Sequence, residues 1–285
     1  MMALPFVVEV KVTASARVLK VPGDFATIQS AVDGAMPGDR IVVKAGDWFG
    51  AVVYKPLEIL GEDGAVIVDG PPSASGLKYG FWIEGTGWAD GTIISGFTFK
   101  VDYPIFGRNV NDVTINDNVM LSPYWGISNI GGSRWTITHN DISGLTDYPD
   151  RMWGSHGILL VSGVTNAPAS HNLVAFNKIS GDYSGYLPSA GILLEVDANS
   201  TDAGEVKFNE VTHNKVETHG SLAAAIVLYF LEAEPSGEDP TNLLCDNTVS
   251  FNNLKDSTIE FFYFPETLED CNAIFANLGK NRGHK

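Results

Sequence analysis

The clearest pattern along the chain is a β-branched or aliphatic residue followed three positions later by asparagine. A unit that recurs every roughly 20 to 50 residues is typical of repeat architectures, and these units carry strand-forming residues without a helical period. We therefore expect a parallel β-solenoid whose coils stack about 4.8 Å apart, with the asparagines in one column at a tight corner. The asparagine intervals are 22, 37, 37, 38 and 25 residues, and the six copies are Ile115 with Asn118, Ile137 with Asn140, Val174 with Asn177, Val211 with Asn214, Val249 with Asn252 and Ile274 with Asn277.

A second column of apolar residues lies in the strand that follows each corner. Ile158, Ile192, Ile226 and Ile259 hold equivalent places in successive units, and the two-residue alternation of a strand points them inward. Monomers seldom leave a large apolar patch in water. We expect either loops of this chain over the outer face or, as the favoured alternative, a homo-oligomer packed through the outer face of the Ile strands. The outward residues are mostly apolar: Leu159, Val161, Leu193, Glu195, Val227, Tyr229, Glu260 and Phe262.

The N-terminal part has a character of its own. Residues 27–35 have the pattern of a short amphipathic helix, which Pro37 and Gly38 end, and strands are expected at 40–44, 57–61 and 65–70. These segments resemble the N-terminal cap of right-handed parallel β-helix proteins, the pectate-lyase-like superfamily. The resemblance depends on four short motifs: Thr27-Ile28-Gln29, Pro37-Gly38-Asp39, Ile41-Val42-Val43 and Gly46-Asp47-Trp48.

The resemblance continues through the asparagine units to about residue 278. It implies an all-β fold, a right-handed parallel β-helix (solenoid) with a short N-terminal capping helix. We expect one domain over residues 1–285, with the cap and first coil at 18–45, coils at 46–278 and a basic tail at 279–285. The first 16 residues are interpreted as a strand rather than a secretion signal, because Glu9 and Lys11 interrupt the apolar run.

Composition excludes some classes of partner. The chain has 285 residues and a formal charge of −16, which argues against nucleic acid and anionic membranes as main partners. No run of 18 apolar residues is present, so no membrane-spanning helix is expected. Cys245 and Cys271 fall one residue out of alignment on successive coils; a disulfide is possible, and two buried free thiols are favoured. The fold resemblance favours a secreted or periplasmic location.

Aromatic residues gather in the loops that follow the asparagine corners. Rings with polar neighbours suit sugar binding, because pyranose CH faces pack on rings while hydroxyls take hydrogen bonds. We therefore expect a polysaccharide or oligosaccharide as partner, held by Tyr124, Trp125, Tyr148, Trp153, Tyr183 and Tyr186. The candidate acids and bases nearby are Asp150, Arg151, His156 and Asp182. Two carboxylates could act as general acid and base on a glycosidic bond, or an arginine or histidine could remove a proton beside a uronate carboxylate. The alternative is that the rings cover a small core within the loops.

No specific enzyme family is matched. His156-Gly157 resembles a piece of the polygalacturonase motifs, but the companion motifs are absent, and those of pectin methylesterases and alginate epimerases are missing too. We expect a carbohydrate-active protein that binds a polysaccharide and, as a lyase or glycoside hydrolase, cleaves it. The alternative is a non-catalytic structural, adhesion or scaffold module.

Acidic residues gather in a second family of loops, which follow the Ile strands. Stacked acidic loops can bind Ca2+, although a solvated rim is the simpler interpretation. No other cofactor is expected. The acidic residues are Asp197, Asp202, Glu205, Glu232, Glu234, Glu238, Asp239, Glu266, Glu269 and Asp270.

Overall fold

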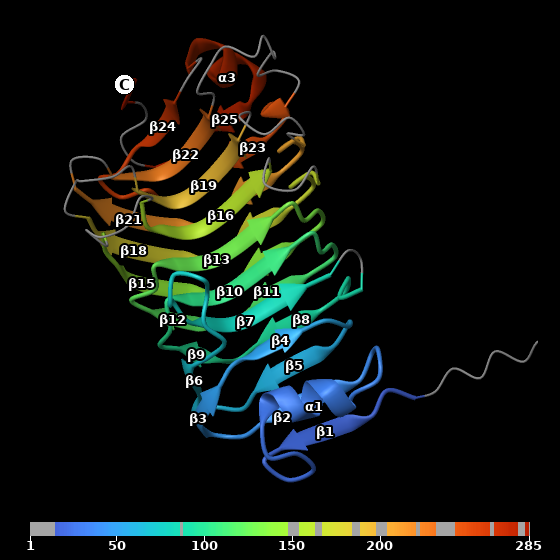
Figure 1. Ribbon diagram of the computed structural model, residues 1–285. Helices are drawn as coiled ribbons and strands as arrows, with labels where there is room; N and C mark the ends of the chain where they lie inside the picture. The colour runs from blue at the N-terminus through green and yellow to red at the C-terminus, as the bar shows by residue number, and fades with distance from the viewer. Residues whose placement is uncertain are drawn as a thin grey trace, which may run out of the picture.

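The computed structural model is an elongated stack of coils that runs from the N-terminal to the C-terminal end (Figure 1). It describes residues 15–85, 88–147, 154–162, 167–183, 189–197, 204–220, 223–231, 243–262, 265–278 and 283–284. All strand pairs between coils are parallel, and the strands form three sheets, as the repeat predicted. The expected strand over residues 6–12 lies outside the described residues. No helix in the described part of the chain is long and apolar enough to cross a membrane.

Each complete coil gives one strand to each of the three sheets. Sheet A contains β1 (Val18–Val21), β2 (Arg40–Val43), β5 (Glu58–Gly61), β8 (Ile93–Ser95), β11 (Thr114–Asn116), β14 (Thr136–Thr138), β17 (Leu173–Ala175), β20 (Glu210–Thr212), β23 (Thr248–Ser250) and β25 (Ala273–Phe275). Sheet B contains β3 (Gly46–Phe49), β6 (Ala65–Asp69), β9 (Thr98–Phe99), β12 (Val119–Leu121), β15 (Asp141–Leu145), β18 (Lys178–Asp182) and β21 (Lys215–His219). Sheet C contains β4 (Ala51–Val53), β7 (Tyr79–Glu84), β10 (Tyr103–Arg108), β13 (Trp125–Ile130), β16 (His156–Ser162), β19 (Ser189–Asp197), β22 (Ala223–Leu231), β24 (Ile259–Phe262) and β26 (Gly283–His284).

The predicted asparagine column lies at the corner between sheets A and B. The side-chain oxygen of Asn177 accepts hydrogen bonds from the backbone and side-chain amides of Asn140, both at 3.0 Å. Asn177 in turn donates twice to Asn214, again at 3.0 Å. The same pattern links all six asparagines from Asn118 to Asn277. Each coil is thus tied to the next by side chains as well as by backbone.

A second asparagine ladder lies at the corner between sheets C and A, and the sequence analysis missed it. Asn172 donates from its backbone and side-chain amides to the side-chain oxygen of Asn209, both at 2.9 Å, and the chain of bonds continues to Asn247 and Asn272. These asparagines precede those of the first ladder by five residues, so each short strand of sheet A in the C-terminal half lies between two ladders. The spacing Asn-x4-Asn links the two ladders in four coils, and this recurrence in the sequence would have revealed the second ladder.

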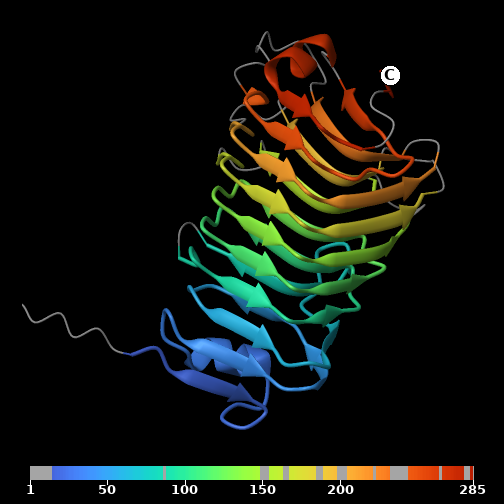
Figure 2. The ribbon, with the colours of Figure 1, turned by 180° about the vertical axis from the view of Figure 1, so that it is seen from behind.

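Helices lie near both ends of the stack (Figure 2). Helix α1 (Ile28–Gly34) begins in a capping box made by Thr27 and Ser30, and it buries Ile28, Ala31 and Val32, so the predicted N-terminal cap is confirmed. At the other end, helix α3 (Pro265–Cys271) occupies a segment that we had expected to be an acidic loop. Proline is well suited to the first turn of a helix, and Leu268 anchors α3 in the core.

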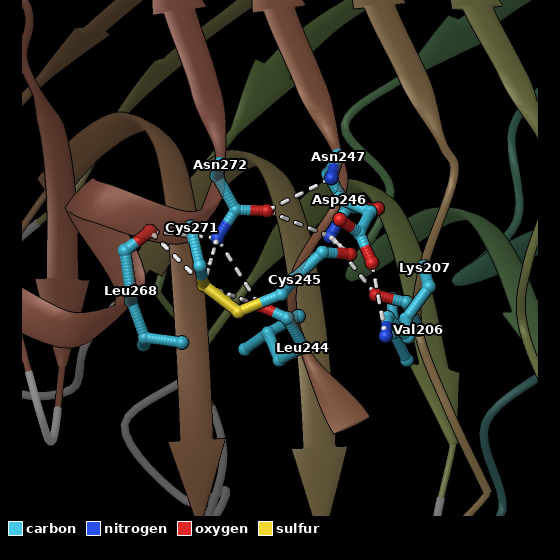
Figure 3. The surroundings of a disulfide bond; sticks show 9 residues. All are labelled: Val206, Lys207, Leu244, Cys245, Asp246, Asn247, Leu268, Cys271 and Asn272. Atoms are coloured by element: carbon cyan, nitrogen blue, oxygen red, sulfur yellow. Dashed lines mark hydrogen bonds and ion pairs between the residues drawn. A yellow bond between two sulfur atoms is a disulfide. The ribbon is translucent and has the colours of Figure 1, made fainter. Parts of the chain in front are cut away.

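The prediction of two free thiols is wrong, because Cys245 and Cys271 form a disulfide (Figure 3). Their Cα atoms lie 5.2 Å apart, within the range of about 4.4–6.8 Å typical of disulfides. Between Cys245 and the ladder residue Asn247, Asp246 adopts a left-handed conformation with φ 60°. The bond joins the last two coils beside the end of the second ladder.

The outer face of the Ile strands is buried within the single chain, in line with the first of the two alternatives expected. Leu159, Leu193 and Val227 point outward from sheet C, yet they are only 3%, 4% and 6% exposed within the single chain. They pack with Ile130 and Val161 and with the alanines of the neighbouring column in a compact cluster outside the solenoid. The chain buries this surface itself, so the reason for expecting a homo-oligomer through this face is removed.

Candidate active site on the outer face of sheet C

A groove of about 260 Å³ lies on the outer face of sheet C. This volume is close to the lower end of the range of about 300–1,000 Å³ for small-molecule sites, which suits a site for one or two sugar rings. Its residues come from four neighbouring strands, β10, β13, β16 and β19, so the register of the sheet fixes their relative positions. The lining residues are Phe106, Arg108, Trp125, Ile130, His156, Leu159, Val161, Glu195 and Asp197.

The strand register places the two charged ends of the groove in one column. Arg108 pairs with Ile130, Ile130 with Val161, and Val161 with Glu195. Three strand spacings separate the backbone of Arg108 from that of Glu195, or roughly 14 Å. The guanidinium therefore lies at one end of the groove and the carboxylate at the other, with apolar side chains between them.

Aromatic rings form a platform in the groove. Trp125 is partly exposed, and its ring stacks on buried Tyr124 with centroids 5.4 Å apart and planes 16° apart. Its indole Nε1 donates to the backbone oxygen of Gly154 at 2.9 Å, so the ring is held in one orientation. Phe106 is supported in the same way by Tyr79 and Trp82, at 5.1 and 6.2 Å. Fixed, partly exposed rings of this kind are suited to packing against the apolar faces of sugars.

Glycines at the start of the sheet C strands allow this arrangement. A Cβ added to Gly126 would lie 2.5 Å from the backbone oxygen of Gly157, and one added to Gly157 would lie 2.6 Å from that of Gly191. Only glycine fits here, because the coils approach each other closely. The neighbouring residues, Trp125 and His156, are thereby stacked on the outer face, with ring centroids 6.1 Å apart.

Two carboxyl groups share the other end of the groove. Glu195 and Asp197 are two residues apart on β19, so they face the same side of the sheet. Glu195 is partly buried, and this burial, followed by the negative charge of Asp197, raises its pKa to about 7. At neutral pH a substantial fraction of Glu195 therefore carries a proton, which is the property required of a general acid.

His156 lines the groove as a neutral imidazole. It is 7% exposed, and burial lowers its pKa to about 3. Its Nδ1 is buried without a hydrogen-bond partner among the described residues, and the same holds for Trp82 Nε1 and Ser128 Oγ on the same face of sheet C.

The structure brings together only part of the site expected from the sequence. Trp125 and His156 line the groove, and Tyr124 supports Trp125 from below. Tyr183 is buried, with its hydroxyl donating to the backbone oxygen of Ala190 at 3.4 Å, and Asp182 is exposed at the end of β18 in sheet B. Neither lines the groove. The other expected residues lie outside the described ones: Tyr148, Asp150, Arg151, Trp153 and Tyr186.

Four groove residues were missed as site candidates: Phe106, Arg108, Glu195 and Asp197. Strand alternation had already placed Glu195 outward, as one of two charged residues on an otherwise apolar face, and that contrast was the available signal. The search had instead favoured residues in loops, where aromatic side chains are densest. Phe106 and Arg108 belong to a coil without the full asparagine unit, so the repeat did not place them.

The acidic loops gave no metal site within the described part of the chain. No group of three or more His, Cys, Asp or Glu residues there is placed to hold a metal ion. Asp202 and the acidic residues of 232–240 lie outside that part. Histidine and phenylalanine alternate at the first corner: the rings of His139, Phe176, His213 and Phe251 stack with centroids 5.1 to 5.3 Å apart.

Comparisons with known proteins show the fold. No protein-family model and no curated sequence matches the chain. Among solved structures, a pectin methylesterase crystallised with a hexasaccharide has a TM-score of 0.57 at 15% identity, over 96% of this chain and 93% of that one. The fold is a right-handed parallel β-helix. The predicted right-handed parallel β-helix fold is thereby confirmed.

Two further structures are similar over most of this chain. An alginate lyase from a Paenibacillus species has a TM-score of 0.47 at 15% identity, over 94% of this chain and 98% of that one. The tailspike protein of an E. coli bacteriophage, crystallised with a pentasaccharide, has a TM-score of 0.44 at 12% identity, over 88% of this chain and 46% of that one.

Proposed function

We propose that this chain is a glycoside hydrolase that binds a polysaccharide in the groove on the outer face of sheet C. The observation that carries the proposal is the pair of carboxyl groups on β19: Glu195, whose pKa is raised to about 7, and Asp197 beside it. The pair shares the groove with Phe106 and Trp125, whose fixed rings suit sugar faces. The fold is also that of a pectin methylesterase crystallised with a hexasaccharide.

The roles of the two carboxyl groups follow from their surroundings. Protonated Glu195 donates its proton to the glycosidic oxygen as the bond to the anomeric carbon breaks. Ionised Asp197 takes a proton from the water that attacks the anomeric carbon, so the products are two sugar chains with one water added. The Cα atoms of residues two apart on a strand lie roughly 7 Å apart. That backbone spacing permits the carboxyl separation of about 6.5–9.5 Å found in inverting enzymes.

A hydrolase fits this groove better than a lyase. A lyase removes a proton beside a uronate carboxylate and needs a cation that neutralises that carboxylate. The cation that lines the groove, Arg108, is three strands away from Glu195, and His156 is neutral at all but strongly acidic pH because burial lowers its pKa to about 3.

The disulfide supports an extracytoplasmic location for this activity. Disulfides persist in secreted and periplasmic proteins and are reduced in most cytosols. Cys245 is buried, and the bond joins adjacent coils of the solenoid, as a structural disulfide does. A polysaccharide is also a substrate found mainly outside cells or in their walls. We therefore propose that the protein acts outside the cytoplasm.

Release of reducing ends from a panel of polysaccharides tests the proposal. With a substrate that wild type cleaves, Glu195→Gln should lower kcat by roughly 100-fold or more while binding is retained, because it removes the proton donor. Glu210→Gln, at the exposed first residue of β20 in sheet A, is the matched control and should behave as wild type. Binding without release by wild type would favour a non-catalytic module, and an active Glu195→Gln variant would refute the assignment of Glu195.

A further inference from the structure

The charges of the groove restrict the kind of polysaccharide that fits it. Its acid end holds two carboxyl groups, Glu195 and Asp197, on one face of β19. The residues between these acids and Arg108 in the same column are Ile130 and Val161, both buried and apolar. Among the described residues, the lining of the groove thus provides no cation beside the carboxyl pair.

The remaining polar lining residue cannot provide a positive charge. Burial keeps the pKa of His156 at about 3, so its ring is an uncharged hydrogen-bonding group at any ordinary pH. A carboxylate bound nearby would gain no ion pair from it.

A polyuronate carries one carboxylate on every sugar, so it cannot pass through the groove without placing a negative charge near Glu195 and Asp197. Burial and the charge of Asp197 already raise the pKa of Glu195 to about 7, so the carboxylate of a uronate placed here would meet an environment that disfavours anions. The net charge of −16 adds a long-range repulsion of polyanions.

We infer that the substrate is a polysaccharide whose sugars next to the cleaved bond are uncharged, and that polyuronates such as pectate and alginate are rejected. The inference rests on the proposed function and adds the substrate class. Arg108, which is exposed at the far end of the groove, is the one lining residue in the described part of the chain that could receive an acidic substituent, three strands from the carboxyl pair.

Matched pairs of polysaccharides that differ only in charge test the inference. The pairs are polygalacturonate with its methyl-esterified form and alginate with its carboxyl-reduced form, together with neutral xylan, mannan, galactan and β-glucan. Binding is measured with full-length wild-type protein at low and high NaCl, and cleavage is followed by reducing ends. We expect binding only to the uncharged polysaccharides, or binding at least tenfold tighter to the uncharged member of each pair. The Kd for the uncharged polysaccharides should depend little on salt.

Variants separate the local effect from the overall charge. The preference is the Kd of the charged member of a pair divided by the Kd of its uncharged member. The double variant Glu195→Gln and Asp197→Asn should lower this ratio by at least threefold. Glu210→Gln, which removes a charge outside the groove, should leave the ratio unchanged. Equal or tighter binding of the charged member in either pair would overturn the inference while leaving polysaccharide binding in place. If no member of the panel binds, the proposed function fails, and the inference with it.

Discussion

The asparagine ladder allows a strict test of what holds the coils together, and Asn177 is its best position. The side chain is 1% exposed and makes five hydrogen bonds. Its oxygen accepts both amides of Asn140, and its nitrogen donates to Asn214 Oδ1 and to the backbone oxygens of Ile137 and Ala175 at 2.8 to 3.1 Å. In Asn177→Ala all five are lost.

The cost follows from the groups left without partners. The backbone amide of Asn140 loses the acceptor to which it donates in the ladder, and the backbone oxygens of Ile137 and Ala175 each lose a donor. A buried polar group left unsatisfied costs about 1–3 kcal/mol, but Asn140 Nδ2 and Asn214 Oδ1 keep other bonds. We therefore expect Asn177→Ala to lower the free energy of unfolding by about 2–4 kcal/mol.

Urea unfolding followed by circular dichroism measures this loss. Asn116→Ala is the matched control, because Asn116 lies near the same corner, is partly exposed and bonds through its side chain to the adjacent Asp117. A change within about 0.5 kcal/mol is expected for the control, as for most surface substitutions. If Asn177→Ala were as mild as Asn116→Ala, the ladder would not stabilise the stack and the reasoning would be refuted.

Two further predictions concern stability. Because the pKa of Glu195 is raised to about 7 in the folded state from an ordinary value of 4.5, folding favours its protonated form, and stability should fall as pH rises between these values. The free energy of unfolding of Glu195→Gln, measured by denaturant titration relative to wild type, should therefore rise by roughly 1–3 kcal/mol as the pH is raised from 4.5 to 8, allowing for the partial exposure of Glu195. A difference between variant and wild type that does not change with pH would contradict the raised pKa. Replacing Cys245 and Cys271 by serine should cost about 3 kcal/mol, because the bond closes a loop with a sequence separation of 26, and an unchanged unfolding midpoint would show that the last coils are held by other contacts.

The fold could be predicted because one physical requirement repeats in every coil. Each corner needs an amide side chain that hydrogen-bonds to the coils before and after it. Asparagine therefore recurs at the equivalent position of successive coils, as at Asn140, Asn177 and Asn214. The inward isoleucines repeat for the same reason, since Ile158 and Ile192 stack directly on each other. A requirement imposed by coil stacking leaves a periodic signal even when loop lengths differ.

The site could not be predicted in the same way, because its residues do not repeat. Arg108 and Glu195 are 87 positions apart (195 − 108) and meet in one groove only through the register of four strands. The pKa of Glu195 depends on burial, which the sequence does not show. The disulfide was missed because Cys271 is the last residue of helix α3, a segment expected to be a loop, so the coil spacing did not give its position.

The central claim is that the groove on sheet C holds the polysaccharide with its cleaved bond at the carboxyl pair. A crystal structure of the Glu195→Gln variant with an oligosaccharide from a polysaccharide that wild type cleaves tests it most directly. We predict sugar rings on Phe106 and Trp125, and the glycosidic oxygen within hydrogen-bond distance of residue 195. Sugar bound instead along the exposed aromatic column at Phe176 and Phe251, with an empty groove, would contradict the account.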